Sequence, residues 1–175
     1  GTDTQTLIDT WLAMEKIAAS GKALAVGVCN HKPHHLQTIF DHGTIVPAVN
    51  QIELHPHLPQ WVTRAFDEDH GIVTESWSPL GGTSKSGWGR ASKPNTLLDD
   101  PTLAAIAAAH GTSVAQVLIR WHLQNGLVVI PKSVHPERIR QNIDVFGFEL
   151  TGSEIEAIAA QETGARVGAD PDDFA

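Results

Sequence analysis

The fold of this chain is decided by the stretch Val129-Ile130-Pro131-Lys132-Ser133-Val134-His135-Pro136-Glu137-Arg138-Ile139-Arg140-Gln141-Asn142. An apolar run ends in a turn that carries Lys132 and Ser133, and Pro136 is typical of a first helical position. The pattern predicts a buried strand, a cationic turn and a helix. Free N–H groups and the helix dipole favour an anion at such a helix start. The stretch therefore predicts a phosphate site with Lys132, Ser133 and Arg138.

The same alternation of apolar runs and helical patterns extends through the rest of the chain. Apolar runs predict strands at residues 23–28, 48–54, 72–77 and 127–130. Helical spacing predicts helices at residues 7–20, 33–42, 60–70, 103–109, 114–124, 137–146 and 153–160, with Thr112 or Ser113 as a cap of the fifth. Strands that alternate with helices predict parallel pairing through right-handed crossovers.

Four strand-helix units are half of a larger architecture. A (β/α)₈ TIM barrel needs eight strands and roughly 250 residues. We therefore expect an α/β fold in which residues 1–175 form a single domain, half of such a barrel, with two unpaired sheet edges. Residues 81–95 are too long for an ordinary connection and predict a binding loop or lid. Trp88 in this segment is either a lid contact to a substrate or a packing anchor.

Composition excludes several classes of protein. Of the 175 residues, 41% are hydrophobic, which suits a soluble globular chain, and the apolar runs fall short of a membrane span. A formal net charge of -8 argues against nucleic-acid and acidic-membrane partners. Cys29 is the single cysteine, which favours a reducing compartment, and residues 1–5 show no secretory signal. We expect a cytoplasmic protein.

Polar side chains follow each predicted strand, where a parallel α/β barrel places its active face. The carboxamides of Asn30 and Gln51 both donate and accept hydrogen bonds, as binding of a planar nicotinamide carboxamide requires. Trp77 offers a flat face for stacking. Each residue alone also suits a structural role in the core, a cap or a turn. The strand ends together present Cys29, Asn30, Asn50, Gln51, Glu53, Trp77, Ser78, Lys132 and Ser133.

Two other chemistries are weighed against this one. The ten histidines include His34-His35 and His55-Pro56-His57, but neighbouring histidines do not share a helical face and no cysteine cluster accompanies them, so we predict no metal site. His31 and His55 could still border a substrate pocket. Glu53 with an acid of residues 67–69 would suit glycoside hydrolysis. Those three acids lie on a helix that we expect to face solvent, which disfavours hydrolysis.

Four segments together resemble the aldo-keto reductase family, specifically its bacterial 2,5-diketo-D-gluconate reductase-like members. The similarity runs in order from about Leu7 to the end of the chain, and it implies a (β/α)₈ reductase that uses NADPH, of which this chain is the C-terminal half. The matching segments are Val26-Gly27-Val28-Cys29-Asn30, Val49-Asn50-Gln51-Ile52-Glu53-Leu54-His55-Pro56, Trp77-Ser78-Pro79-Leu80-Gly81 and residues 131–142.

The resemblance also implies roles for individual residues. Asn30 and Gln51 resemble the ligands of the nicotinamide carboxamide, and Trp77 resembles the aromatic residue that stacks on the nicotinamide. Cys29 stands where many members have Ser, and a thiol is a weaker donor. By the same resemblance, Ser78, Leu80 and Gly81 contact the pyrophosphate, Lys132, Ser133 and Arg138 hold the 2′-phosphate, and Val134, Gln141 and Asn142 lie near the ribose and adenine.

The catalytic residues of the family are not carried over. Members use a Tyr as general acid, tuned by a Lys and an Asp and aided by a His, all borne on the first four barrel strands. This chain contains no Tyr, and its first helix resembles the one that follows the fourth strand. Loss of acid catalysis alone costs on the order of 10²- to 10⁴-fold in rate. The resemblance therefore implies no catalytic residue here and an inactive fragment.

The sequence is best interpreted as the cofactor-binding half of an NADPH-dependent reductase for a small aldehyde, ketone or keto-sugar acid. The missing N-terminal half of the barrel is expected in cis or in trans. A second interpretation, from another class, is a nucleotide-binding or interaction module that never reacts, either truncated or completed by a partner.

Overall fold

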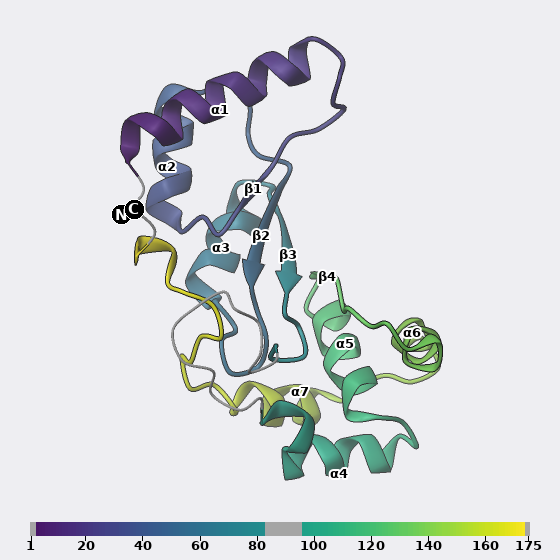
Figure 1. Ribbon diagram of the computed structural model, residues 1–175. Coiled ribbons are helices and arrows are strands. Elements are labelled where there is room, and N and C mark those ends of the chain that lie inside the picture. Colours follow the sequence, from purple (N-terminus) through teal and green to yellow (C-terminus); the bar gives the residue numbers. More distant parts are fainter. Residues whose placement is uncertain (1–2, 83–95, 174–175) are drawn as a thin grey trace. The chain divides into compact units, whose positions relative to one another are not determined.

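The computed structural model describes residues 3–82 and 96–173. The chain forms an α/β fold with a parallel four-stranded sheet in the order β1-β2-β3-β4 (Figure 1). The strands are β1 (Val28–Cys29), β2 (Val49–Glu53), β3 (Val73–Trp77) and β4 (Val128–Val129). The α-helices are α1 (Thr4–Ala19), α2 (Pro33–His42), α3 (Trp61–Asp69), α4 (Pro101–Ala109), α5 (Val114–Gln124), α6 (Pro136–Ile143) and α7 (Gly152–Ala159). Two short 3₁₀ helices, η1 (Leu97–Asp99) and η2 (Pro171–Asp173), add to these.

Helix starts are set by local sequence signals. Proline occupies the first turn of α2, α4 and α6, where its missing N–H costs nothing. Of the two residues considered for the start of α5, Ser113 is the cap: its hydroxyl accepts from the N–H of Gln116, whose side chain accepts in return from the N–H of Ser113. The predicted bounds of α2 and α5 are confirmed.

Several predicted bounds are wrong. The strand expected at residues 23–28 is wrong except at Val28, because only Val28 and Cys29 pair with β2; Leu24 is fully exposed. The fourth strand is shorter than residues 127–130 and is not buried, since Val128 and Ile130 are 41% and 43% exposed. The helix expected to reach residue 146 ends at Ile143. Of the predicted loop or lid at 81–95, residues 83–95, with Trp88, lie outside the described part of the chain.

The chain divides into two compact units. The first comprises residues 1–52, 60–75 and 169–175, and the second comprises residues 53–59 and 76–168. In the first unit α1 packs on α2 (Figure 1), around a core of Leu7, Trp11, Val26 and Ile39. In the second unit α4 packs on α5 and α7, and the core includes Leu103, Leu118, Trp121 and Ile158, all fully buried.

The pairing of β1 with β2 fixes the first unit's strand ends. The strands are parallel, and Cys29 pairs with Gln51. Just before β1, the backbone at Gly27 comes very close to Val49 at the start of β2. A Cβ on Gly27 would lie 2.4 Å from Val49 Cγ1 and 2.6 Å from the Val49 carbonyl oxygen. Only glycine fits there without displacing β2, so this close approach helps to set the register that places Cys29 and Asn30 beside Gln51.

None of the helices within residues 3–82 and 96–173 is by itself long and apolar enough to cross a membrane. Only α4 and α5 taken together reach the required length and hydropathy, and the pair is bent by 86° at its break.

Candidate functional site

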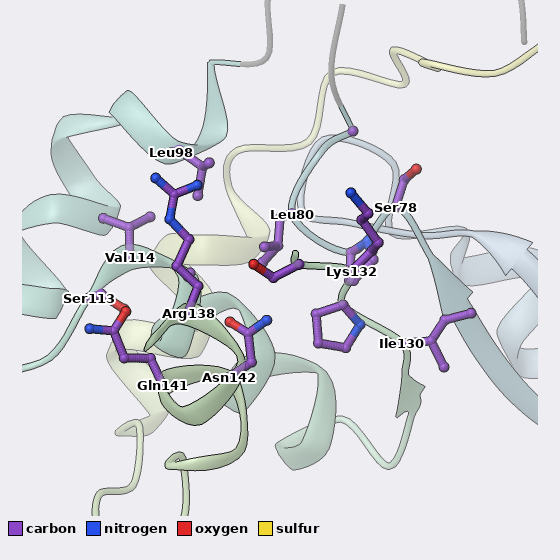
Figure 2. A pocket seen from close by; sticks show the side chains of 15 residues that line it. Ser78, Leu80, Leu98, Ser113, Val114, Ile130, Lys132, Arg138, Gln141 and Asn142 are labelled. Carbon is purple, nitrogen blue, oxygen red and sulfur yellow. The ribbon is translucent and has the colours of Figure 1, made fainter. Parts of the chain in front are cut away.

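A cavity of about 610 Å³ lies in the second unit (Figure 2). The loop after β3, η1, the start of α5, the loop after β4 and helix α6 all contribute to its wall. Seven of the predicted cofactor residues line it: Ser78, Leu80, Lys132, Ser133, Arg138, Gln141 and Asn142. The fold thus brings together residues from two separate predicted groups, those assigned to the pyrophosphate and those assigned to the 2′-phosphate and adenosine.

The cationic side of this cavity has the chemistry of an anion site. Lys132 from the loop and Arg138 from α6 extend toward the same side in Figure 2. Ser133 Oγ accepts from the N–H of His135 at 3.1 Å, so its own O–H proton can be donated to a ligand. Helix α6 has no side-chain hydrogen bond at its N-cap, so its first N–H groups also suit an anion.

The loop after β3 has an unusual backbone. Ser78 directly follows the strand and adopts a φ of 52°, in the left-handed region that serine rarely occupies. The N–H of Gly81 donates to the carbonyl of Ser78 at 2.8 Å and closes the turn. Such strained positions cluster at functional sites, where surrounding contacts hold them. This turn directs Ser78 and Leu80 into the cavity wall.

Three predicted residues of the second unit are not in the cavity wall. Gly81 is buried within its turn, and Val134 is 69% exposed. Trp77 is half-buried and touches the chain near Gly168, where a Cβ would lie only 2.6 Å from Trp77 Cη2. The segment at Gly168 therefore lies directly against the edge of the Trp77 ring.

In the first unit, the ends of β1 and β2 hold the three remaining predicted residues. The N–H of Asn30 donates to the carbonyl of Gln51 at 2.9 Å, and Cys29 is exposed beside them. Gln51 Nε2 donates to the carboxylate of Glu75, which orients the amide and presents its oxygen as an acceptor. The sequence reasoning missed Glu75. Its place on β3, next to β2 in the sheet, is the signal that could have found it.

A second group that the sequence reasoning missed is hydrogen-bonded to Asn50 of β2. Asp67 on α3 is fully buried, which corrects the expectation that the three acids of this helix face solvent; Glu68 and Asp69 are exposed. Asp67 accepts hydrogen bonds from Thr74 and Asn50. The buried residues of α3, Thr63 and Asp67, are four positions apart. This i,i+4 spacing is a sequence signal for a polar inner face.

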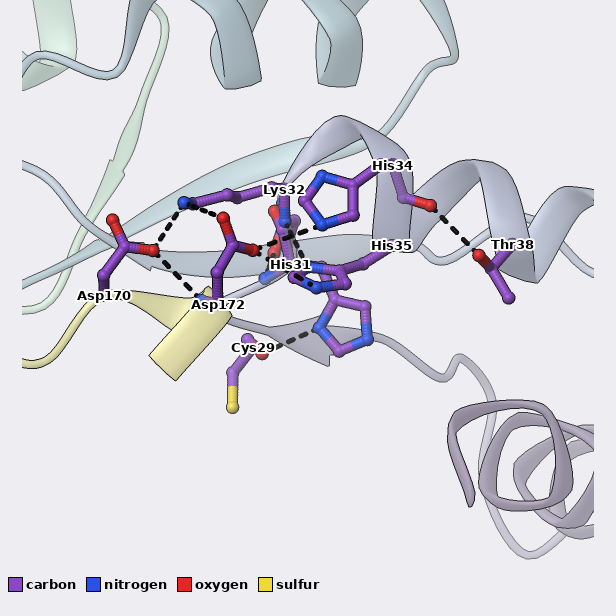
Figure 3. A network of polar contacts seen from close by, with 9 residues as sticks. Cys29, His31, Lys32, His34, His35, Thr38, Asp170 and Asp172 are labelled. Atoms are coloured by element: carbon purple, nitrogen blue, oxygen red, sulfur yellow. Dashed lines mark hydrogen bonds and ion pairs between the residues drawn. The ribbon is translucent and has the colours of Figure 1, made fainter. Parts of the chain in front are cut away.

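The first unit also contains an ion-pair network at the start of α2 (Figure 3). The Lys32 ammonium contacts Asp170 and lies 2.5 Å from Asp172 Oδ2. Asp172 Oδ1 lies 3.2 Å from His34 Nε2 and 3.5 Å from His35 Nε2. The network ties the C-terminal segment around η2 to the loop that follows Asn30.

His34, His35 and Asp172 also have the composition of a metal site. The distances from Asp172 to the two imidazoles are close to the ~3.3 Å between neighbouring ligand atoms of tetrahedral zinc, and the ligand atoms of all three residues lie within 4.8 Å of one another. However, the N–H of Lys32 donates to His35 Nδ1 at 3.1 Å, so neutral His35 carries its proton on Nε2, facing Asp172. Burial lowers the pKa of His35 and favours this neutral form. The geometry therefore favours a network of Lys32 ion pairs and a His35 hydrogen bond over metal coordination, and the absence of a metal site stays a prediction.

Glu53 is a buried carboxylate of the second unit. It accepts from the backbone N–H groups of Val167 and Gly168 at 2.5 and 3.0 Å, and its Oε1 lies 3.1 Å from His55 Nε2. Burial acts to raise the pKa of Glu53, but the bonds from His55 and the two N–H groups outweigh it and leave the pKa lowered. Glu53 is thus held as an anion, which does not suit the general acid of glycoside hydrolysis, because that carboxyl needs a raised pKa.

We expect Glu53→Gln to destabilise the second unit by about 2 kcal/mol at pH 7, because the amide turns a donor toward groups that themselves donate. A lowered carboxyl pKa stabilises the fold above the unfolded pKa, and that stability is lost as pH falls below about 4.5. Urea unfolding at pH 7 and pH 4 should therefore show a smaller difference between parent and variant at pH 4. A difference that grows on acidification would contradict this role.

Eight cavity residues were not assigned to the cofactor from the sequence, among them Leu98, Ser113, Val114 and Ile130. Ser113 had been identified only as a helix cap and Ile130 only as part of a strand. Leu98 belongs to η1, which the sequence pattern did not predict. These residues reach the cavity through tertiary packing, and no local motif marks them.

Comparison with known proteins gives a consistent result. The family model described as "Aldo/keto reductase family" matches residues 2–162. An aldo-keto reductase of Mycolicibacterium smegmatis is 50% identical over 167 residues, which are 95% of this chain and 56% of that protein. Morphine 6-dehydrogenase of Pseudomonas putida is 48% identical over 172 residues, 98% of this chain and 58% of that protein. The 2,5-diketo-D-gluconic acid reductase B of a Corynebacterium species is 42% identical over 165 residues, 94% of this chain and 56% of that protein.

Solved structures agree. The crystal structure of Gox0644 in its apoform superposes with a TM-score of 0.83 at 45% identity, covering 94% of this chain and 56% of that one. A Gox0644 mutant in complex with NADPH gives a TM-score of 0.85 at 44% identity, with 96% and 58% covered. The chain therefore spans little more than half the length of the relatives it matches.

Proposed function

Because the chain belongs to the aldo/keto reductase family, we propose that it is the cofactor-binding, C-terminal half of an NADPH-dependent carbonyl reductase barrel. The chain matches 56–58% of the length of the three relatives compared above, which supports the proposal that it corresponds to about half of a barrel. So does the sheet of four strands, half the number in a (β/α)₈ barrel. The other half, in cis or in trans, is the proposed partner. The cytoplasmic location stays a prediction.

One observation carries the proposal: Lys132, Ser133 and Arg138 line one cavity with Gln141 and Asn142. The 2′-phosphate of NADPH has close to two negative charges at neutral pH. An ammonium, a guanidinium and a hydroxyl donor suit it well, because hydrogen bonds between charged groups are about twice as strong as neutral ones. Gln141 and Asn142 offer amides to the ribose and adenine. NADPH in complex with a Gox0644 mutant supports the choice of cofactor.

In the first unit, Asn30 and Gln51 are the proposed ligands of the nicotinamide carboxamide. Glu75 fixes the Gln51 amide with its oxygen as the acceptor, which matches the NH₂ of a carboxamide. When bound, NADPH supplies the hydride for carbonyl reduction. The residues of this chain bind and orient: Asn30 and Gln51 hold the carboxamide plane, and the cations of the cavity hold the phosphate.

The proton needed by the product alcohol has no proposed donor in this chain. The sequence has no Tyr, and the described cofactor residues are amides, cations and hydroxyls. We therefore propose that the general acid belongs to the other half of the barrel. The substrate class is a small aldehyde, ketone or keto-sugar acid.

The test uses the full chain, verified as 175 residues by intact mass. Isothermal titration with NADPH, and loss of NADPH absorbance with methylglyoxal as substrate, measure binding and turnover separately. We expect binding without turnover, and turnover after addition of the separately expressed N-terminal half of a relative. Turnover by the chain alone would contradict the proposed absence of the general acid. Absence of NADPH binding would contradict the cofactor site.

A nucleotide-binding module that never reacts is the second candidate, favoured by the lack of Tyr in a family that reduces carbonyls. It predicts NADPH binding that persists without turnover even when the N-terminal half of a relative is added. The complementation arm of the same experiment thus decides between the two functions.

A further inference from the structure

Asp67 is an unusual buried acid in the first unit. Its side chain is fully buried on the inner face of α3. Thr74 Oγ1 donates to Asp67 Oδ2 at 2.9 Å, and Asn50 Nδ2 lies 3.3 Å from both carboxylate oxygens. Among residues 3–82 and 96–173, no Lys, Arg or His forms an ion pair with it. A buried carboxylate without an ion-pair partner is costly, so its hydrogen-bond partners are informative.

Asn50 carries the network from Asp67 to the loop after β1. Its Nδ2 also donates to the carbonyl oxygen of His31 at 2.9 Å, and its Oδ1 accepts from the N–H of His31 at 3.3 Å. Asn50 is fully buried. One side chain therefore holds both backbone groups of the residue that directly follows Asn30, and Asp67 accepts the remaining hydrogen of that amide.

The clamped turn is strained. Asn30 has a φ of 57°, in the left-handed region, which asparagine tolerates better than most residues but still at a cost. Its N–H donates to the carbonyl of Gln51 at 2.9 Å on one side, and the Asn50 clamp on His31 fixes the other side. A strained conformation persists only when such contacts over-determine it.

From this geometry we propose that Asp67 is a positioning residue for the cofactor. By fixing the Asn50 amide, Asp67 holds the turn at Asn30 and so aims the Asn30 carboxamide at the nicotinamide carboxamide. This inference rests on the proposed function, because Asn30 is a nicotinamide ligand only if NADPH binds. It goes further by naming a residue that acts through Asn50 and His31, and that sets the affinity for the nicotinamide end of NADPH and not for the adenosine end.

The alternative is that Asp67 only stabilises the unit. The two roles differ in what Asp67→Ala does. Without the carboxylate, one N–H of Asn50 loses its acceptor, so the amide can rotate and release His31. The adenosine cavity of the second unit contains none of these residues. Positioning therefore predicts a loss confined to the nicotinamide end of the ligand.

The experiment titrates the full chain with NADPH and with 2′,5′-ADP, which carries the 2′-phosphate but no nicotinamide. For Asp67→Ala we expect NADPH affinity to fall about tenfold, the loss of roughly one well-made hydrogen bond, and 2′,5′-ADP affinity to change by less than about twofold. Asp67→Asn keeps an acceptor oxygen for Asn50, so we expect NADPH affinity within about threefold of the parent.

Two further variants make the test robust. Ile39→Val loosens the buried core of the same unit without touching the network, and it should leave both affinities unchanged. Asn50→Leu replaces Asp67→Ala as the test if Asp67→Ala does not fold. Leucine has a similar volume to asparagine but cannot hydrogen-bond His31, so we expect the same loss of NADPH affinity with 2′,5′-ADP affinity unchanged. The proposal would be overturned if the affinities for both ligands fell equally, or if neither variant lost affinity for NADPH.

Failure of the proposed function is recognised separately. If the parent does not bind 2′,5′-ADP, the assignment of the cavity to the 2′-phosphate is wrong. The positioning role of Asp67 is then tested by NMR titration with reduced nicotinamide mononucleotide. The Asn30 side-chain amide signals should shift in the parent and in Asp67→Asn but not in Asp67→Ala. Equal shifts in all three, or no shift in the parent, would overturn the positioning role.

Discussion

The double variant Lys132→Met with Arg138→Ala should bind NADPH about 10²- to 10³-fold more weakly than the parent, while NADH affinity changes by less than about threefold. Both cations line the cavity that we assign to the 2′-phosphate. Each hydrogen bond to a charged group contributes about 1.5–3 kcal/mol, and NADH lacks the phosphate that would receive them. Isothermal titration with both cofactors at one ionic strength measures the ratio, because salt screens exposed charges.

A matched control separates local contacts from overall charge. Lys22→Met with Arg140→Ala removes the same two charges. Arg140 lies on the same helix as Arg138, but it pairs with Glu137 at 3.3 Å and is not part of the cavity wall. We expect the control to change both affinities by less than about threefold. If the test variant loses NADPH and NADH equally, the two cations do not bind the 2′-phosphate.

Helices were more predictable than strands, and the reason is physical. The bounds of α2 and α5 follow from local signals: Pro33 at the first position of α2, and a capping box at Ser113 that begins α5. Strand β1 depends instead on its partner, since only Val28 and Cys29 pair with β2. The apolar run of residues 23–28 looked like a buried strand because hydrophobicity alone does not reveal which residues find a pairing partner.

In the site, too, residues close in sequence were predictable and contacts between residues far apart in sequence were not. Lys132, Ser133 and Arg138 are close in sequence, and a turn that leads into a helix brings them to one cavity. Distant partners were not predictable in this way. Asp67 meets Asn50 only because α3 packs its inner face on the sheet, and Lys32 meets Asp170 across most of the length of the chain. A polar residue on a helix predicts solvent exposure by default, and tertiary packing overrides that default.

Asp67→Asn should stabilise the fold by about 1–3 kcal/mol at pH 7, even though it removes a charge that is hydrogen-bonded. Burial raises the pKa of Asp67 from 3.8 to about 6, against the opposing effects of the Thr74 and Asn50 hydrogen bonds and the charge of His70. The ionised form is thus disfavoured inside the protein relative to water. An amide of the same shape has no charge to bury, and it keeps one acceptor oxygen for Asn50.

The sign of the pH dependence follows from the same shift. Between pH 3.8 and about 6 the folded state binds more protons at Asp67 than the unfolded state, so stability falls as pH rises through this window. Urea unfolding of the parent at several pH values from 4 to 7 should show this decline, of up to about 3 kcal/mol, and Asp67→Asn should lack the part due to this residue. A variant that is less stable than the parent at pH 7 would show that the carboxylate stabilises the fold. A stabilised variant would instead show that the hydrogen bonds from Thr74 and Asn50 do not offset the cost of burying the Asp67 charge.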